Sequence, residues 1–275
     1  MFLLSMMRPL RLRLKVSLLL ASVVVTPPVS ADTFSNFLGM KFVTLPGGSF
    51  NMGAASKEPG VPFDELPQHA VQIGRFQIMS TEVTLAQYKQ YIIDSSRIDI
   101  VTEEFMDANA HGDTAPVTFV SWNDTRNFIF WLNKNKPAND KGKYRLPSES
   151  EWEYACHAGG SDVYCGGETA SSVAWYLSNT VSHQQPVAQK AASEFGLYDM
   201  SGNVREWVED CYHPNYENAP TDGGAWIKSC ASNNRIIRGG SWKEDKQEAR
   251  ATGRLAVAIP TQSVTIGFRV VRDIP

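Results

Sequence analysis

Two short segments toward the C-terminal end combine residue types that could bind a metal ion or transfer a proton. In the segment GNVREW, Asn203 and Glu206 stand three residues apart. In a turn or at the start of a helix, their side chains and the carbonyl of Val204 could offer hard oxygen ligands, which calcium prefers. The alternative is that Asn203 caps a short helix and Glu206 lies in solvent.

The second segment, RGGSWKEDK, begins at Arg238 and places a hydroxyl, an indole and a carboxylate close together. Ser241 and Trp242 could line a pocket in which Glu244 acts as a general acid or base. Arg254, further along the chain, could orient an anionic substrate. The alternative is that Glu244 belongs to an exposed charged run and that Arg254 only forms a structural ion pair.

The histidines give no local metal motif. No two of them stand at the i, i+4 spacing that would present both to one metal ion from a helix, so each is expected to have a surface or structural role. A discontinuous cluster built by folding remains open. The sequence also lacks the G-x-S-x-G, H-E-x-x-H, P-loop and dinucleotide-binding patterns. The five histidines are His69, His111, His157, His183 and His213.

The first 31 residues have the pattern of a secretory signal peptide. A basic stretch precedes the apolar run from Val16 to Val25, and Val29-Ser30-Ala31 supplies small residues for cleavage. The apolar run is shorter than the roughly 18 residues that a membrane span needs. We therefore expect a secreted or periplasmic protein without stable membrane insertion, with residues 32–275 as a single domain.

The charge of the chain argues against nucleic acid as a partner. The full sequence has a net charge of −3, and the first 31 residues contain four of the 26 basic residues but none of the 29 acidic ones. Cleavage would therefore leave a more acidic protein, without the basic patch that nucleic acids require.

Four cysteines in an exported chain are expected to pair. Cys211 and Cys230 enclose a segment rich in Gly, Pro and Asn, while Cys156 and Cys165 flank the short segment HAGGSDVY. The pairs Cys156–Cys165 and Cys211–Cys230 are favoured among the three possible connectivities. Zinc is the rival interpretation, but no C-x2-C pair supports it.

Regular secondary structure is expected to be sparse. Polar caps followed by apolar residues at helical spacing predict helices at residues 84–93, 121–133 and 148–158. Alternating β-branched residues predict strands at 41–45, 69–78, 235–238 and 266–271. With 20 Gly and 15 Pro, long loops must connect these elements and be held by aromatic packing, disulfides or metal ions.

The segments FVTLPGGSFNMG, TEVTLAQY, GLYDMSGNVREW, RGGSW and IGFR follow one another along the chain. The order of these motifs resembles that of the formylglycine-generating enzyme, or sulfatase-modifying factor, superfamily. The resemblance implies an α+β fold, a single compact domain related to C-type lectins. It also implies structural calcium at Asn203, Val204 and Glu206. A second calcium site at Asn179 is weakened because no acidic residue follows it closely. The matching segments are FVTLPGGSFNMG, DELPQHAV, TEVTLAQY, PVTFVSWNDT, YRLPSESEWEYA, GLYDMSGNVREW, RGGSW and IGFR.

The chemistry implied by the resemblance changes because the family's copper-binding cysteines are missing. Their positions fall on Glu244 and Ala249, and no cysteine follows Cys230. Carboxylate and methyl groups cannot replace two thiolates on copper(I), which argues against copper and against formylglycine generation. The branch that uses histidine-bound iron has an additional helical domain that is missing here, so an iron cofactor is left open.

The nearest functional resemblance is to the exported branch that includes pyoverdine-chromophore maturation factors. It implies a maturation or accessory factor, with oxidative modification of a metabolite or a partner protein as the candidate activity. The alternative is a non-catalytic periplasmic module that binds protein or glycan on the same scaffold.

Overall fold

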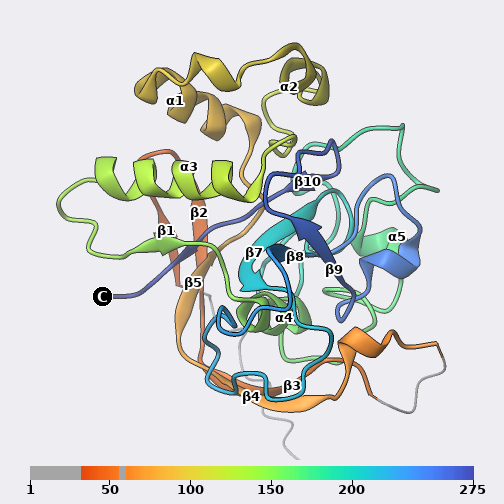
Figure 1. Ribbon diagram of the computed structural model, residues 1–275. Helices are drawn as coiled ribbons and strands as arrows, with labels where there is room; N and C mark the ends of the chain where they lie inside the picture. Colours follow the sequence, from red (N-terminus) through yellow and green to blue (C-terminus); the bar gives the residue numbers. More distant parts are fainter. Residues whose placement is uncertain (1–31, 56–59) are drawn as a thin grey trace, which may run out of the picture. The chain divides into compact units, whose positions relative to one another are not determined.

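Short strands in three sheets alternate with short helices in the computed structural model, which describes residues 32–55 and 60–275 (Figure 1). The predicted signal peptide, residues 1–31, lies outside the described residues. This mixture of elements confirms the predicted α+β class. Within the described ranges, no helix is long and apolar enough to cross a membrane. The α-helices are α1 (Leu85–Ser95), α2 (Glu103–Ala108), α3 (Trp122–Asn135), α4 (Glu149–His157) and α5 (Ala170–Val173).

The largest sheet has the strand order β1-β2-β5-β11-β6, and its neighbouring strands are antiparallel. The second sheet has the order β10-β7-β8-β9, and the third pairs β3 with β4. The strands are β1 (Thr33–Ser35), β2 (Lys41–Leu45), β3 (Gly48–Met52), β4 (His69–Ile73), β5 (Phe76–Met79), β6 (Tyr144–Arg145), β7 (Arg205–Cys211), β8 (Asn234–Arg238), β9 (Arg254–Ala258), β10 (Ile266–Gly267) and β11 (Val271–Arg272). Turns of 3-10 helix lie at Phe63–Glu65, Ile98–Ile100 and Lys246–Ala249.

The three predicted helices are confirmed as α1, α3 and α4, and each begins at the predicted cap. Thr84, Ser121 and Ser148 each accept a hydrogen bond from a backbone N–H of the first turn. The side chain three residues later accepts a hydrogen bond from the backbone N–H of the cap residue. These reciprocal bonds satisfy amide groups that a helix start otherwise leaves unpaired. α2 was not predicted, although Thr102 caps it in a similar way through the amide of Phe105.

Two of the strand predictions were wrong in extent. Residues 69–78 form two strands in different sheets, because the chain turns at Gly74 and Arg75 between β4 and β5. Residues 266–271 are likewise divided between two strands. β10 pairs with β7 in the second sheet, whereas β11 pairs with β5 and β6 in the largest sheet. Alternation of residue types predicts extended backbone but not the point at which a chain leaves one sheet for another.

Aromatic side chains fill the core between the sheets and the helices. Tyr88 of α1 stacks on Phe128 of α3, with ring centroids 5.5 Å apart, and Phe268 meets Phe128 edge to face. Trp152 and Trp207 are fully buried. Both predicted disulfides, Cys156–Cys165 and Cys211–Cys230, are confirmed.

Charged side chains are buried as well, and they connect segments that are distant in the sequence. Arg238 and Arg269 have no exposed surface, and each faces a buried glutamate. A buried charge is tolerated only when it is paired and hydrogen-bonded. These buried ion pairs therefore fix the positions of loops in a fold whose helices and strands are short.

Candidate functional site

The segment Gly239–Trp242 follows β8 and makes a turn that requires glycine at its first two positions. Gly239 and Gly240 have φ angles of +94° and +70°, in the left-handed region. A Cβ on Gly240 would also lie 2.7 Å from a backbone oxygen. After this turn, the amide of Trp242 donates to the carbonyl of Asn203 at 2.8 Å. The two segments that were predicted to do chemistry are therefore hydrogen-bonded to each other.

The carboxylate of Glu244 is held by Arg205 and Ser241. Arg205 Nε donates to both oxygens of Glu244, at 3.0 and 2.8 Å, and Ser241 Oγ donates to one of them at 2.8 Å. The Arg205 side chain is only 2% exposed, whereas that of Glu244 is 29% exposed. Glu244 is therefore neither a freely solvated charge nor an unpaired catalytic carboxylate, because it balances a buried guanidinium.

Trp242 lines a cavity of about 370 Å³, which we call the Trp242 cavity. Phe119 and Val264 add apolar surface, while α2 contributes Glu104 and Asp107. Cavities of a few hundred Å³ with aromatic walls and a few polar groups are typical of small-molecule sites. The structure thus places Trp242 in the wall of this cavity, whereas Ser241 is not among the residues that line it.

The Trp242 cavity is also lined by two histidines that are far apart in the sequence. The rings of His111 and His183 stack in parallel, with centroids 3.9 Å apart and an interplanar angle of 4°. Burial, and secondly the charge of His183, lowers the pKa of His111 below its usual 6.5. Sequence reasoning missed this pair because folding alone brings the two loops together.

Replacing His183 with Gln is expected to raise the pKa of His111 toward 6.5, because it removes one of the two causes of the lowered value. With His183 present, His111 binds more proton in the unfolded than in the folded chain between its lowered folded pKa and about pH 6.5, so its contribution to stability rises with pH across that window. An NMR titration of the imidazole resonances measures the pKa directly. His69→Gln, which changes a histidine outside the cavity, is the control and should leave His111 unchanged. An unaltered His111 pKa in His183→Gln would contradict the stacked arrangement.

The carboxylate of Glu206 does not join Asn203 in the predicted way. Arg269 donates to its two oxygens, at 2.6 and 2.7 Å, and the indole of Trp152 donates to it at 2.8 Å. The amide oxygen of Asn203 accepts from the backbone of Gln185 at 2.9 Å. Both predicted calcium ligands therefore have protein partners, and Glu206 fits a cation poorly because Arg269 already neutralises it.

Two other carboxylates near Asn203 have oxygen atoms that fit a hard cation better. Asn203 Nδ2 donates to Glu82 at 3.1 Å, but the second oxygen of Glu82 and one oxygen of Asp199 are buried without hydrogen-bond partners in the described part of the chain. Burial raises the pKa of Asp199 to about 6 and, together with the charge of Asp199, raises that of Glu82 well above its usual value.

A cation at Glu82 and Asp199 would satisfy those two oxygens and favour the ionised carboxylates. Within residues 32–55 and 60–275, no group of three or more His, Cys, Asp or Glu side chains is arranged to hold a metal ion. Backbone oxygens would have to complete the set, and the carbonyl of Val204 remains the predicted one. Sequence reasoning missed Glu82, although the motif TEVTLAQY contains it.

Asn179, the predicted ligand of a second calcium site, closes a turn instead. Its amide oxygen accepts from the backbone of Tyr176 at 2.8 Å, and its nitrogen donates to the carbonyl of Ala174 at 3.0 Å. These bonds tie the side chain to the backbone of the preceding residues. The contacts of Asn179 thus account for this residue without a metal ion.

Arg254 is engaged in a buried ion pair. Its guanidinium donates to both oxygens of Glu149, at 2.9 and 2.7 Å, and also to the carbonyls of Asp64 and His213. The side chain is 1% exposed and lies over the ring of Tyr216. The structure therefore gives Arg254 the structural role that was the alternative at the sequence level, and Arg254 is not among the residues that line the Trp242 cavity.

A model of the sulfatase-modifying factor enzyme 1-like domain matches residues 30–274. The chain belongs to this family. Among solved structures of the family fold, that of PvdO from Pseudomonas aeruginosa has a TM-score of 0.77 and 31% identity, over 90% of this chain and 100% of PvdO. The formylglycine-generating enzyme of Streptomyces coelicolor is 28% identical over 84% of this chain and 88% of that enzyme.

The family domain also occurs as part of longer proteins. The serine/threonine-protein kinase Pkn1 of Chlamydia trachomatis is 28% identical over 85% of this chain, but the match spans only 38% of the kinase. The activity of that longer protein therefore does not pass to this chain.

The copper chemistry expected of formylglycine-generating members of the family does not fit the residues found here. All four cysteines of the sequence lie in the two disulfides. At the positions assigned by resemblance to the copper cysteines, Glu244 is paired with Arg205 and Ala249 is buried. Copper(I) requires soft ligands such as thiolates, and neither side chain supplies one.

Proposed function

We propose that this protein is an exported maturation or accessory factor of the family, which binds a small-molecule metabolite or a segment of a periplasmic partner protein in the Trp242 cavity. The observation that carries the proposal is the position of Trp242. The turn at the two glycines of the family motif RGGSW is followed by this indole, which lies in the wall of the cavity. Phe119 and the stacked pair His111/His183 then add apolar and hydrogen-bonding surface for a ligand with both characters.

The family match and the likeness to PvdO support a role similar to that of a maturation factor. The two disulfides support export, because such bonds persist in oxidising compartments. The proposal includes one structural calcium ion held by Glu82 and Asp199 with backbone oxygens, close to Asn203 and Val204. In this site calcium would compensate buried negative charge and connect the segment that contains Glu82 to the segment from Asp199 to Val204.

A non-catalytic binding module is the second candidate. It is favoured by the pairing of Glu244 with Arg205, because a carboxylate in an ion pair is a weak general base. In this case the Ser241–Glu244–Arg205 cluster would only hold the turn that positions Trp242.

The variant Glu244→Gln separates the two candidates. The wild-type protein and the variant are each incubated with an extract of small molecules from the native host, and mass spectrometry identifies retained and altered compounds. A maturation factor converts at least one compound. Loss of about tenfold or more of that conversion in Glu244→Gln, with binding retained, would assign a catalytic role to this carboxylate although Arg205 pairs with it. Retention of unaltered compounds by both proteins would instead support the binding module.

The variant Trp242→Ala tests the location of the site. It is expected to weaken retention of the same compounds by about tenfold or more, since truncation of a buried aromatic anchor costs more than about 1.4 kcal/mol. Phe63→Ala, which removes an exposed aromatic side chain elsewhere, serves as the control. Unchanged retention by a folded Trp242→Ala protein would place the site outside the Trp242 cavity.

A further inference from the structure

A second and larger cavity, of about 690 Å³, lies between β3, the end of α4 and the loop that follows it. It shares no lining residue with the Trp242 cavity. Its volume falls in the range of small-molecule sites. The side chains that bear on its chemistry are Phe50, Asn51, Gln68, Tyr154, His157 and Asp162.

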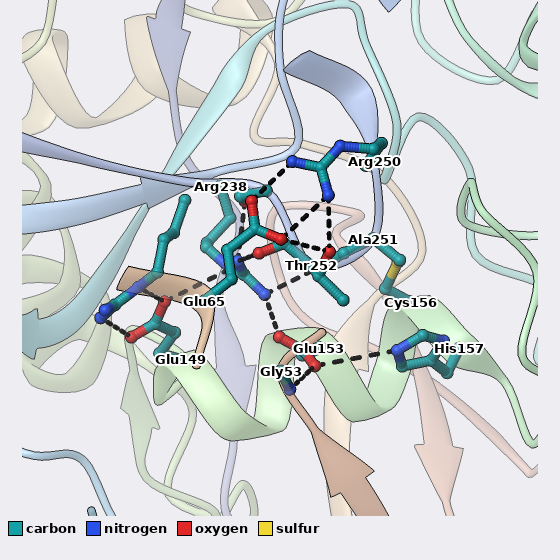
Figure 2. Close-up of polar contacts among 12 residues, drawn as sticks. Gly53, Glu65, Glu149, Glu153, Cys156, His157, Arg238, Arg250, Ala251 and Thr252 are labelled. Carbon is teal, nitrogen blue, oxygen red and sulfur yellow. Dashed lines mark hydrogen bonds and ion pairs between the residues drawn. The ribbon is translucent and has the colours of Figure 1, made fainter. Parts of the chain in front are cut away.

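One wall of this cavity contains a histidine that a buried carboxylate orients. His157 is the last residue of α4, and its Nε2 lies 3.8 Å from Glu153, as Figure 2 shows. Glu153 is itself fixed, because it accepts from the amide of Gly53 at 2.7 Å and from Arg238. The other ring nitrogen of His157, Nδ1, does not contact this carboxylate. This Nδ1 atom is buried and has no hydrogen-bond partner in the described part of the chain.

The charges around the cavity are largely balanced within the protein. Arg250 donates to both oxygens of Glu65, at 2.9 and 2.5 Å, and Thr252 donates to the same carboxylate at 2.7 Å (Figure 2). Asp162 is half-buried and has no salt bridge among the described residues. A ligand with a negative charge would be repelled by Asp162 and would find Arg250 already paired, so the wall favours a neutral ligand.

The remaining wall combines an aromatic surface with amide groups. Phe50 meets Tyr154 edge to face, with ring centroids 5.5 Å apart, and lies 6.2 Å from the ring of His157. The side chain of Asn51 is exposed and makes no hydrogen bond within the described chain. The nitrogen of Gln68 donates to the carbonyl of Gly53 at 3.1 Å, which fixes this amide in the wall. Aromatic rings pack on C–H faces, while amides and carboxylates bind hydroxyl groups.

We propose that this cavity is a second binding site and that it takes a neutral, hydroxyl-rich small molecule of the saccharide class. The unpartnered Nδ1 of His157 shares a hydrogen bond with a ligand hydroxyl group, which can donate or accept, and the carboxylate of Asp162 accepts from another hydroxyl group. The side-chain nitrogen of Asn51 donates to a ligand oxygen, and Phe50 covers a C–H face. The site is independent of the Trp242 cavity and of the function proposed for it.

The test is ligand-observed NMR with the purified protein and three probes. Methyl β-D-glucopyranoside and N-acetylglucosamine are the neutral probes, and glucuronate is the anionic one. At least one neutral probe is expected to bind with a Kd of about 1 mM or tighter, and more tightly than glucuronate. Asn51→Ala is expected to weaken this binding by about tenfold, as is Phe50→Ala. Trp242→Ala, at the other cavity, is the matched control and should leave the affinity for the neutral probe unchanged.

The variant His157→Gln tests the hydrogen bond between His157 and the ligand and should also weaken binding. Because His157 faces Glu153, this variant could lose stability, and its thermal midpoint is measured alongside. Asn51→Ala changes an exposed side chain that makes no hydrogen bond among the described residues, so this variant should fold. A change in its affinity would therefore report on binding and not on stability. Absence of binding by both neutral probes, equal binding of glucuronate, or unchanged affinity in Asn51→Ala would each overturn the proposal.

Discussion

Replacing Arg269 with Met is expected to lower the free energy of unfolding by about 3–5 kcal/mol, the usual cost of leaving a buried charge without its partner. Arg269 has no exposed surface and donates to both oxygens of Glu206. It also donates to the carbonyls of Met79 and Tyr198, at 3.0 and 2.9 Å. One side chain therefore connects β5 and the loop before Gly202 to β7.

The loss is expected to be large because the cluster around Arg269 is otherwise negative. Glu82 and Asp199 lie close enough for their charges to interact with those of Glu206 and Arg269. Without the guanidinium, the protein must either bury a bare carboxylate at position 206 or protonate it. Either response costs stability at neutral pH.

Urea unfolding of the wild type and of Arg269→Met, both with intact disulfides, measures this effect. Lys89→Met is the matched control, because it removes the cation of an ion pair whose side chains are 50% and 61% exposed. The control should change stability by no more than about 1 kcal/mol. An Arg269→Met protein as stable as this control would show that the buried pair contributes little.

Removing calcium is expected to destabilise the protein by about 2.7 kcal/mol when the comparison is made at a calcium concentration of about 100 times the Kd. The expected site includes the unpartnered oxygens of Glu82 and Asp199. Thermal unfolding at neutral pH, with calcium or with a calcium-selective chelator, provides the measurement. Mass spectrometry of the protein purified without chelators provides the stoichiometry, which should be near one calcium per chain.

Asp199→Asn is the companion variant for the calcium prediction. It keeps an oxygen that can accept from the amide of Ala188, which now donates to Asp199 at 2.7 Å, but it removes a charged ligand. The variant should unfold at the same temperature with calcium and with chelator. Magnesium should not replace calcium in the wild type, because it demands a smaller octahedral site. Equal midpoints of the wild type in calcium and chelator would contradict a structural calcium ion.

Local signals in the sequence were sufficient for the helices α1, α3 and α4, and they favoured the observed disulfides. A cap such as Thr84 with Gln87 acts over three residues, so the same atoms are neighbours in the sequence and in the fold. Cys211 and Cys230 enclose one loop, and loop closure is also a local property. The family motifs predicted the fold class for a related reason, because they are contiguous segments.

The sites were decided by contacts between distant segments. Glu244 and Glu206 were predicted to be available for chemistry, but Arg205 and Arg269 neutralise them across the fold. The pair His111/His183 could not be predicted either, since its members come from two separate loops.

By itself, the sequence determined which residue types are present, where three of the helices begin, and that no cysteine stands at the family's copper positions. Only the tertiary structure decided which carboxylates are paired and which are not. The physical reason is that the state of a buried charge depends on the nearest opposite charge in space, whatever its position in the chain. The same reason moves the candidate calcium ligands from Glu206 to Glu82 and Asp199.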